Sequence, residues 1–172
     1  MDISNKLEIA KKFIETSKKN LCFIVADSLV SQCIAEDMKD SYQVVDLAED
    51  FTPFKPFLNL LSKGNLPEKN VREKTYSIQT ESFVSFFKTG MADERYDIPI
   101  DNEELYELGQ YVKSIVELFK ELPVKNYIFT NAQNIFSDSF AVIKELENHE
   151  LASKFVFCFN SDVTNPSVEV LD

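Results

Sequence analysis

The chain has 172 residues, of which 29 are acidic and 18 are basic, so its formal net charge at pH 7 is −11. A surface that binds nucleic acid or an acidic membrane presents clustered Lys and Arg, and this charge balance argues against both kinds of partner. No apolar run reaches the roughly 18 to 20 residues of a membrane span, and residues 1–20 lack the apolar stretch of a signal peptide. We therefore expect a cytoplasmic protein with one domain over residues 1–172.

Helical and strand-like patterns alternate along the chain. Apolar residues at helical spacing predict helices over residues 4–18, 29–38, 101–119 and 138–147, with a further helical turn or two within 51–62. Short apolar runs predict strands at 21–25, 42–47, 125–130 and 155–159. Strands that alternate with helices form a mainly parallel sheet, so the expected fold class is an α/β protein, a three-layer α/β/α sandwich.

Residues 64–100 are the least readable part of the sequence. The segment 75–80 (TYSIQT) is compatible with an edge strand. Phe83, Phe86 and Phe87 share one face at helical spacing, which predicts burial; the alternative is an exposed aromatic patch that docks a partner.

The corner after the first strand has the length of a phosphate-binding loop without its chemistry. In G-x-x-x-x-G-K-[ST], backbone N–H groups of the loop wrap the phosphates, Lys neutralises them and the hydroxyl holds Mg²⁺. The four defining positions of the motif are here occupied by Ala26, Ser31, Gln32 and Cys33. Asp27 adds a negative charge where an anion would dock, and no glycine precedes Gly64. Taken alone, this corner is more simply interpreted as an ordinary strand–turn–helix connection.

The end of the third predicted strand is the second place where the chain can be compared with an ATPase. A working ATPase needs acidic residues there to organise Mg²⁺ and the attacking water, and this chain has Thr130-Asn131-Ala132-Gln133. The chain resembles the STAND class of signalling ATPases, relatives of the AAA+ family, in which an acidic pair followed by Ala and Gln or His stands at this place. The aromatic and proline-rich stretch 51–61 and the polar Phe159-Asn-Ser-Asp162 resemble further segments of that class.

The resemblance implies a P-loop NTPase-like fold in which the first strand lies beside the fourth, then the third, then the second. It implies that the class's fifth strand and helical lid would follow Asp172, so the chain would be the N-terminal part of a larger signalling protein. It also implies a vestigial nucleotide site without catalytic residues, bound metal or cofactor, made by Ala26, Asp27, Ser31, Gln32, Cys33, Thr130 and Asn131. The expected function is that of a pseudo-ATPase module that contacts a protein partner or the rest of its own polypeptide.

Two other functions fit the sequence. Asn131-Ala132 followed by residues 143–147 is similar to the third-strand region of the clamp-loader δ-type subunits, which implies an AAA+-like adaptor in DNA replication. A small enzyme is the other alternative. It would require Asp27, Cys33 and Asn131 to line one pocket at the carboxyl ends of the strands, where α/β sheets usually bind ligands.

The cysteines and the single histidine suggest no metal centre. Cys22 and Cys158 lie in apolar runs and are expected to be buried and reduced, and the sequence has no Cys-x-x-Cys pair. His149 lies in a polar helix end, where a solvated side chain is expected. The acidic clusters 46/49/50 and 93/94/97 lack EF-hand spacing and are interpreted as solvated faces.

Overall fold

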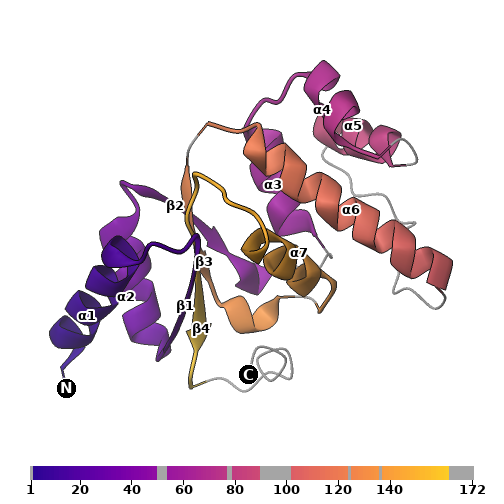
Figure 1. Ribbon diagram of the computed structural model, residues 1–172. Helices are drawn as coiled ribbons and strands as arrows, with labels where there is room; N and C mark the ends of the chain where they lie inside the picture. Colours follow the sequence, from indigo (N-terminus) through magenta and orange to yellow (C-terminus); the bar gives the residue numbers. More distant parts are fainter. Residues whose placement is uncertain are drawn as a thin grey trace. The chain divides into compact units, whose positions relative to one another are not determined.

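A computed structural model describes residues 2–49, 54–76, 79–89, 102–123, 125–135 and 137–162 of the chain. Within these ranges the elements are four strands and seven α-helices, together with two short 3₁₀ turns (Figure 1). The chain groups into two compact units. The first, here called the sheet unit, comprises residues 1–50, 124–135 and 150–172; the second, the helical unit, comprises residues 51–123 and 136–149. The prediction of a single domain over 1–172 stays a prediction.

The sheet unit is built on one parallel sheet. Its strands are β1 (Leu21–Ala26), β2 (Tyr42–Asp46), β3 (Asn126–Thr130) and β4 (Phe155–Asn160). They lie in the order β1-β4-β3-β2, and each neighbouring pair is parallel. The strand order implied by the family resemblance is therefore confirmed, as is an α/β fold with a parallel sheet. Because all strands are parallel, their carboxyl ends meet at one edge of the sheet.

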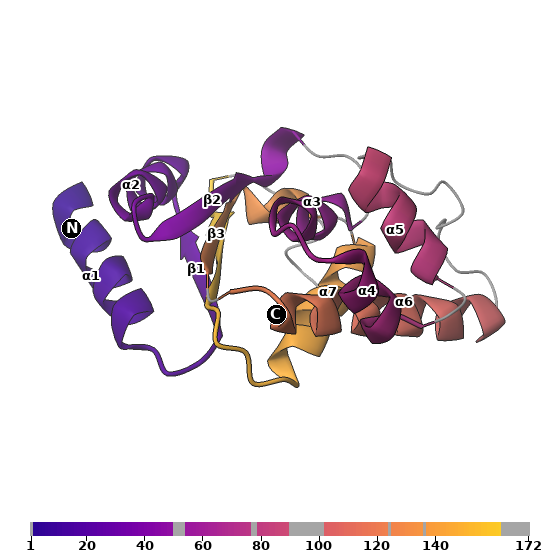
Figure 2. The same ribbon diagram turned by 90° about the horizontal axis from the view of Figure 1, so that it is seen from above.

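Helices α1 (Ile3–Thr16) and α2 (Ser28–Met38) cover one face of this sheet (Figures 1 and 2). The Asp2 side chain caps α1 by accepting a hydrogen bond from the Asn5 backbone N–H at 2.8 Å. Side chains alternate along each strand, so every second residue joins these helices in a common core. That core contains Ala10, Ile14, Cys22, Val30, Ile34, Ala35, Met38, Tyr42, Ile128, Val156 and Cys158.

The other face of the sheet carries a row of aromatic rings. Phe23, Phe157 and Phe129 are in register on three adjacent strands. Their ring centroids are 5.8 Å apart between Phe23 and Phe157 and 4.6 Å apart between Phe157 and Phe129, and the planes of the second pair are nearly parallel, with an interplanar angle of 7°. Tyr127 stacks on Phe155 in the same way at 5.2 Å. Such pairs contribute about 0.5–1.5 kcal/mol each beyond the burial of their area, so this aromatic row helps to fix the strand register.

The helical unit consists of α3 (Lys55–Lys63), α4 (Glu68–Lys74), α5 (Thr80–Thr89), α6 (Asn102–Lys120) and α7 (Ser137–Glu147). Tyr111 of α6 lies at the centre of its packing. The Tyr111 ring stacks on the Phe83 ring with their centroids 4.6 Å apart, and it packs against the Phe54 ring with their centroids 5.1 Å apart. Within the described residues, no helix combines the length and the apolar character that crossing a membrane requires.

Residues 64–100 differ most from the sequence-based expectations. Thr80 begins α5, so the edge strand expected over 75–80 is wrong where the structure describes that segment. Phe83 and Phe86 are buried, which confirms the burial interpretation of the aromatic cluster for these two rings. The acidic cluster 93/94/97 and the helix-start residue Asp101 lie outside the described residues.

Candidate functional site

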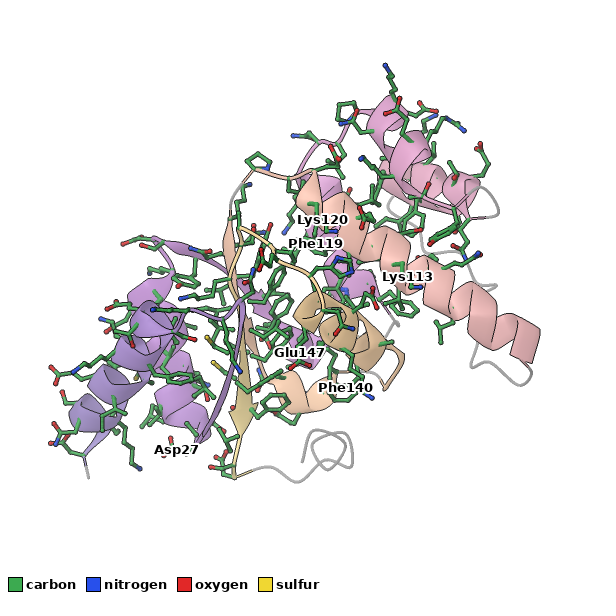
Figure 3. The ribbon with its side chains drawn as sticks, in the orientation of Figure 1. Asp27, Lys113, Phe119, Lys120, Phe140 and Glu147 are labelled. Atoms are coloured by element: carbon green, nitrogen blue, oxygen red, sulfur yellow. The ribbon has the colours of Figure 1, made fainter. Side chains whose placement is uncertain are left out.

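The connection from β1 to α2 is tighter than a phosphate-binding loop. Only Asp27 stands between the last residue of β1, Ala26, and the first residue of α2, Ser28 (Figure 3). The match in length to an eight-residue phosphate-binding loop is therefore wrong, and the simpler interpretation as a strand–turn–helix connection is confirmed, because residues 28–33 are already helical. The physical reason is local. The Asp27 side chain accepts a hydrogen bond from the Val30 backbone N–H at 2.9 Å, so Asp27 caps α2 and the helix begins at the next residue.

Two carboxylates occupy the amino-terminal end of α2. Asp162 accepts hydrogen bonds from the Ser28 backbone N–H at 3.2 Å and from the Ser28 hydroxyl at 2.8 Å. Asp27 accepts from Val30 and lies 3.7 Å from the Lys6 ammonium. Helix N-termini favour anions because their first N–H groups have no partner within the helix. In this chain the protein's own acids fill that role.

The carboxyl ends of β2, β3 and β4 are joined by a chain of side-chain hydrogen bonds, here called the amide relay. Asn131 follows β3 in a left-handed conformation, with φ 54°. Its amide nitrogen donates to Asp46 Oδ1 at 2.7 Å, and its amide oxygen accepts from Asn160 Nδ2 at 2.7 Å. Asp46 Oδ1 also accepts from the Ala48 backbone N–H at 2.9 Å. Because an ionised carboxylate can only accept, Asp46 sets the orientation of both amides.

The amide relay borders a cavity of about 400 Å³, here called the polar cavity, between α2 and the strand ends. It is lined by Ser28, Ser31, Gln32, Ala35, Glu36, Lys39, Val44, Asp46, Thr130, Asn131 and Asn160. Ser31 is 2% exposed and Asn160 is 7% exposed. Ser31 Oγ and Asn160 Oδ1 are both buried and have no hydrogen-bond partner among the described residues. Unsatisfied buried polar atoms are costly, and both of these atoms belong to residues of the cavity lining.

The residues predicted for the vestigial site divide between two places. Ser31, Gln32, Thr130 and Asn131 line the polar cavity, whereas Ala26 and Asp27 line a separate groove, and Cys33 lines neither. The pocket shared by Asp27, Cys33 and Asn131, which the small-enzyme alternative requires, is therefore not formed by these cavities. The sequence-based site lacked Glu36, Lys39, Asp46 and Asn160. The signal for Asp46 and Asn160 was their position at strand ends, where parallel sheets place their ligands.

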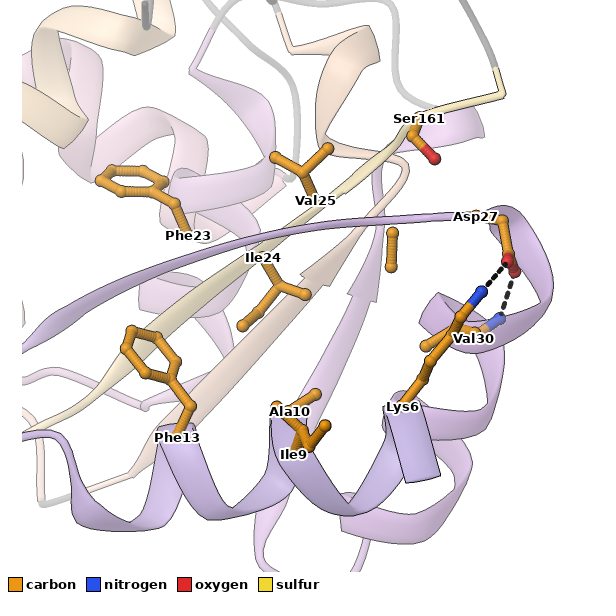
Figure 4. A pocket seen from close by; sticks show the side chains of 11 residues that line it. Lys6, Ile9, Ala10, Phe13, Phe23, Ile24, Val25, Asp27, Val30 and Ser161 are labelled. Carbon is orange, nitrogen blue, oxygen red and sulfur yellow. Dashed lines mark hydrogen bonds and ion pairs between the residues drawn. The ribbon is translucent and has the colours of Figure 1, made fainter. Parts of the chain in front are cut away.

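The groove along β1 is largely apolar, and we call it the edge groove (Figure 4). It has a volume of about 670 Å³ and is lined by Lys6, Ile9, Ala10, Phe13, Phe23, Ile24, Val25, Ala26, Asp27, Val30 and Ser161. Val25 is 67% exposed and Ile9 is 57% exposed. β1 is an outer strand of the described sheet, so one side of its backbone faces no strand among the described residues.

The remaining candidate groups have structural explanations. Cys22 and Cys158 are buried free thiols, as predicted. The prediction of a solvated His149 is wrong: its side chain is partly buried, and Nε2 lies 2.9 Å from Glu145 Oε1, one helical turn earlier. Among the described residues, no cluster of three His, Cys, Asp or Glu side chains is arranged to hold a metal ion.

No protein-family model, curated protein or solved structure matches this chain. Its function is therefore argued from the geometry of the polar cavity and the edge groove.

Proposed function

We propose that this chain is a non-catalytic, NTPase-like module that acts through contacts with a protein partner. The three-layer sandwich, the P-loop NTPase identity and the relation to the STAND class belong to this proposal. The strand order β1-β4-β3-β2 supports it, because it is the order that the resemblance to that class implies. The position of α2, which starts at the carboxyl end of β1, supports it as well.

One observation carries the non-catalytic part of the proposal: the N–H groups at the start of α2 are occupied by Asp27 and Asp162. A triphosphate at this place would have to displace Asp162 and approach Asp27 without a neutralising lysine, since Gln32 stands at that position. One like-charge pair at 4 Å costs about 4 kcal/mol at an effective dielectric of about 20. Thr130 and Asn131 provide no carboxylate at the end of β3 to organise Mg²⁺.

We expect no saturable binding of Mg-ATP tighter than about 1 mM in isothermal titration calorimetry, and no phosphate release above the background rate. The physical reason is the charge of Asp27 and Asp162 at the helix terminus. Asp162→Asn is the matched variant, because it keeps the size of the side chain and removes its charge. Any residual affinity for nucleotide should rise in this variant. Tight binding or turnover by the wild-type chain would contradict the proposal.

The edge groove supports the second part of the proposal, contact with a protein. It exposes Ile9, Phe13, Phe23 and Val25 together, beside an edge of β1 that no described strand covers. Large apolar side chains that gather on a surface mark interaction sites, and an open edge offers backbone hydrogen bonds to a partner strand.

A photoreactive side chain placed at position 25 should therefore form a discrete cross-linked product with a partner in cells. The same side chain at Lys69, an 83% exposed position on the helical unit, is the control and should give no matching product. Equal products from both positions would count against a contact at the edge groove. If the product contained clamp-loader subunits, the replication adaptor would replace the signalling module as the favoured function.

A further inference from the structure

We propose that residues 167–172, here called the tail segment, cover the edge groove as a further strand that runs antiparallel to β1. The tail segment has the sequence Ser-Val-Glu-Val-Leu-Asp and lies outside the described residues. This inference goes beyond the proposed function and does not rest on it. It follows from the groove itself, from the way the chain leaves β4, and from the sequence after Asp162.

The face of the sheet unit around the edge groove is unusually apolar. Six of the eight large apolar side chains that the described residues expose belong to α1, β1 and the first turn of α2, namely Ile3, Ile9, Phe13, Phe23, Val25 and Leu29. Phe23 and Val25 project from one face of β1, and Ile24 projects from the other, against the core beside α1. A strand that pairs with β1 would therefore find apolar surface on both of its own faces.

The chain leaves β4 beside this groove. Ser161 belongs to the groove lining (Figure 4), and its backbone N–H donates to the Ala26 carbonyl at 2.8 Å. Asp162 accepts hydrogen bonds from Ser28, the first residue of α2. The chain has thus reached the carboxyl end of β1 by Asp162. A segment that turns back from this point and follows β1 runs antiparallel to it.

The connection to the tail segment has the length and the composition that such a turn requires. Residues 163–166 have the sequence Val-Thr-Asn-Pro, and Asn-Pro is a turn signal. Four residues reach up to about 13 Å, whereas neighbouring strands lie about 4.8 Å apart. The connection can therefore span the end of β1 to the edge that no described strand covers. The tail segment and β1 each have six residues, so the two can pair along the whole of β1.

The alternation of side chains in the tail segment selects the face that each of them takes. Val168 and Val170 flank Glu169, which gives the period of two that is typical of a strand, and Val is a residue that strands favour. One orientation places both valines on the side of Phe23 and Val25 as apolar cross-strand neighbours. The opposite orientation would press the Glu169 carboxylate onto those apolar side chains, which is costly.

The favoured orientation also suits the side of the groove that α1 forms. Glu169 and Leu171 then face α1, because they alternate with the two valines. The groove lining has one basic residue, Lys6, and it lies on α1. Ile9 and Phe13 continue the same side of the groove with apolar side chains. A carboxylate and a leucine in the tail segment therefore meet a cation and an apolar surface.

Cover by the tail segment bears on access to the edge groove. Because a connection of four residues holds the tail segment beside β1, its effective concentration there is in the roughly millimolar range of short flexible linkers. Ordering six residues costs conformational entropy, so the strand is displaceable. A partner strand would therefore have to displace the tail segment before it pairs with β1.

The first test uses the purified full chain with a photoreactive side chain at position 25, irradiated at low protein concentration. Mass spectrometry locates the attachment point, which we expect within residues 167–172. The same side chain at Lys69 is the control and should give no product with the tail segment. Attachment from position 25 only to residues outside the tail segment would overturn the proposal.

A second test keeps the wild-type sequence. In nuclear magnetic resonance spectra, the methyl groups of Val168 and Val170 should show nuclear Overhauser contacts to the Phe23 ring and to Val25. In an equimolar mixture of ¹³C-labelled and unlabelled chains, these contacts should stay within the labelled chain. Contacts that cross between chains would assign the groove to the tail segment of a second copy and would overturn cover by the chain's own segment.

Two matched variants make the assignment specific. Val170→Asp places a charge against the apolar groove, so it should abolish the contacts and speed amide exchange in residues 167–171 at least about tenfold. Val163→Asp makes the same change in the connection, outside the tail segment, and should leave contacts and exchange as in the wild-type chain. An equal effect of the two variants would count against the strand.

The proposed function and this inference fail in different ways. In cells, Val170→Asp should raise the yield of the partner product from position 25 several-fold, since the groove is then uncovered; an unchanged yield would refute the competition. A partner product without any contact of the tail segment overturns the inference and leaves the proposed function standing. Contact of the tail segment, with no partner product even in Val170→Asp, supports the inference and contradicts the protein contact at the groove.

Discussion

Cys158 lies in the centre of the parallel sheet with its side chain fully buried. Burial disfavours the thiolate and raises the pKa of the Cys158 thiol to about 12. At neutral pH this thiol is therefore protonated and shielded. Cys33 is the partly exposed member of the three cysteines. We therefore expect the reactivity of the three thiols to follow their exposure.

We predict that iodoacetamide at pH 8 modifies Cys33 in the folded protein and leaves Cys22 and Cys158 intact. Mass spectrometry of tryptic peptides measures the extent at each site. In denaturant all three should react at similar rates, and Cys33→Ser should remove the native-state product. Rapid modification of Cys158 without denaturant would show that the sheet opens readily.

For single residues, the sequence predicts where some residues of the site lie but not which residues they bind. Asn131 and Asn160 end apolar runs, so their position at the sheet edge could be predicted. The bond from Asn131 to Asp46 could not, because it spans 85 positions and depends on which strands are neighbours. The same holds for the Ser28–Asp162 contact, which spans 134 positions. No local pattern contains such information.

Among the elements, α4 and α5 are linked by ion pairs of two side chains, Arg72 of α4 and Lys88 of α5. The Arg72 guanidinium donates to Glu68 on its own helix and to Glu81 on α5. The hydrogen bonds from Arg72 lower the pKa values of both carboxyls, and the charge of Lys88 lowers the pKa of Glu68 further. A carboxyl whose folded pKa is depressed contributes stability above its unfolded pKa and loses it as pH falls through the folded value.

We therefore expect amide protection in α4 and α5 to decline when the pH is lowered from 7 to about 3.5, below the usual carboxyl pKa. The loss should stay under about tenfold, because these side chains are exposed and screened by solvent. Arg72→Met should show lower protection at pH 7 and a smaller further change on acidification, because only the pair of Lys88 with Glu68 remains. Hydrogen exchange, corrected for intrinsic rates, measures both. A pH response as large in Arg72→Met as in the wild-type chain would assign it to other groups.

The same two helices show why some elements escaped prediction. α4 buries a single apolar residue, Val71, so its sequence has no apolar periodicity to detect. In α5 the spacing of Phe83, Val84 and Phe86 did carry a helical signal. The start of α2 at Ser28 lies one residue before the predicted helix over 29–38, and Asp is among the preferred residues immediately before a helix. The comparison with an eight-residue motif obscured that capping role of Asp27.

For the whole molecule, the class of fold was more predictable than the site. Four short apolar runs predicted four strands, and each lies within one residue of its expected bounds at either end. The strand order followed from the family resemblance, since no run by itself indicates its neighbours. The division into a sheet unit and a helical unit had no counterpart in the sequence, because segments of both alternate along the chain.

The position of β4 between β1 and β3 has a consequence for synthesis on the ribosome. β1 emerges first, yet the strand beside it is the last of the four to be translated. Until then the nascent chain exposes Phe23 and its neighbours with no sheet to join, and closing the long intervening loop limits the rate at which pairing can begin. We therefore expect β1 to pair in the sheet only after β4 has left the exit tunnel.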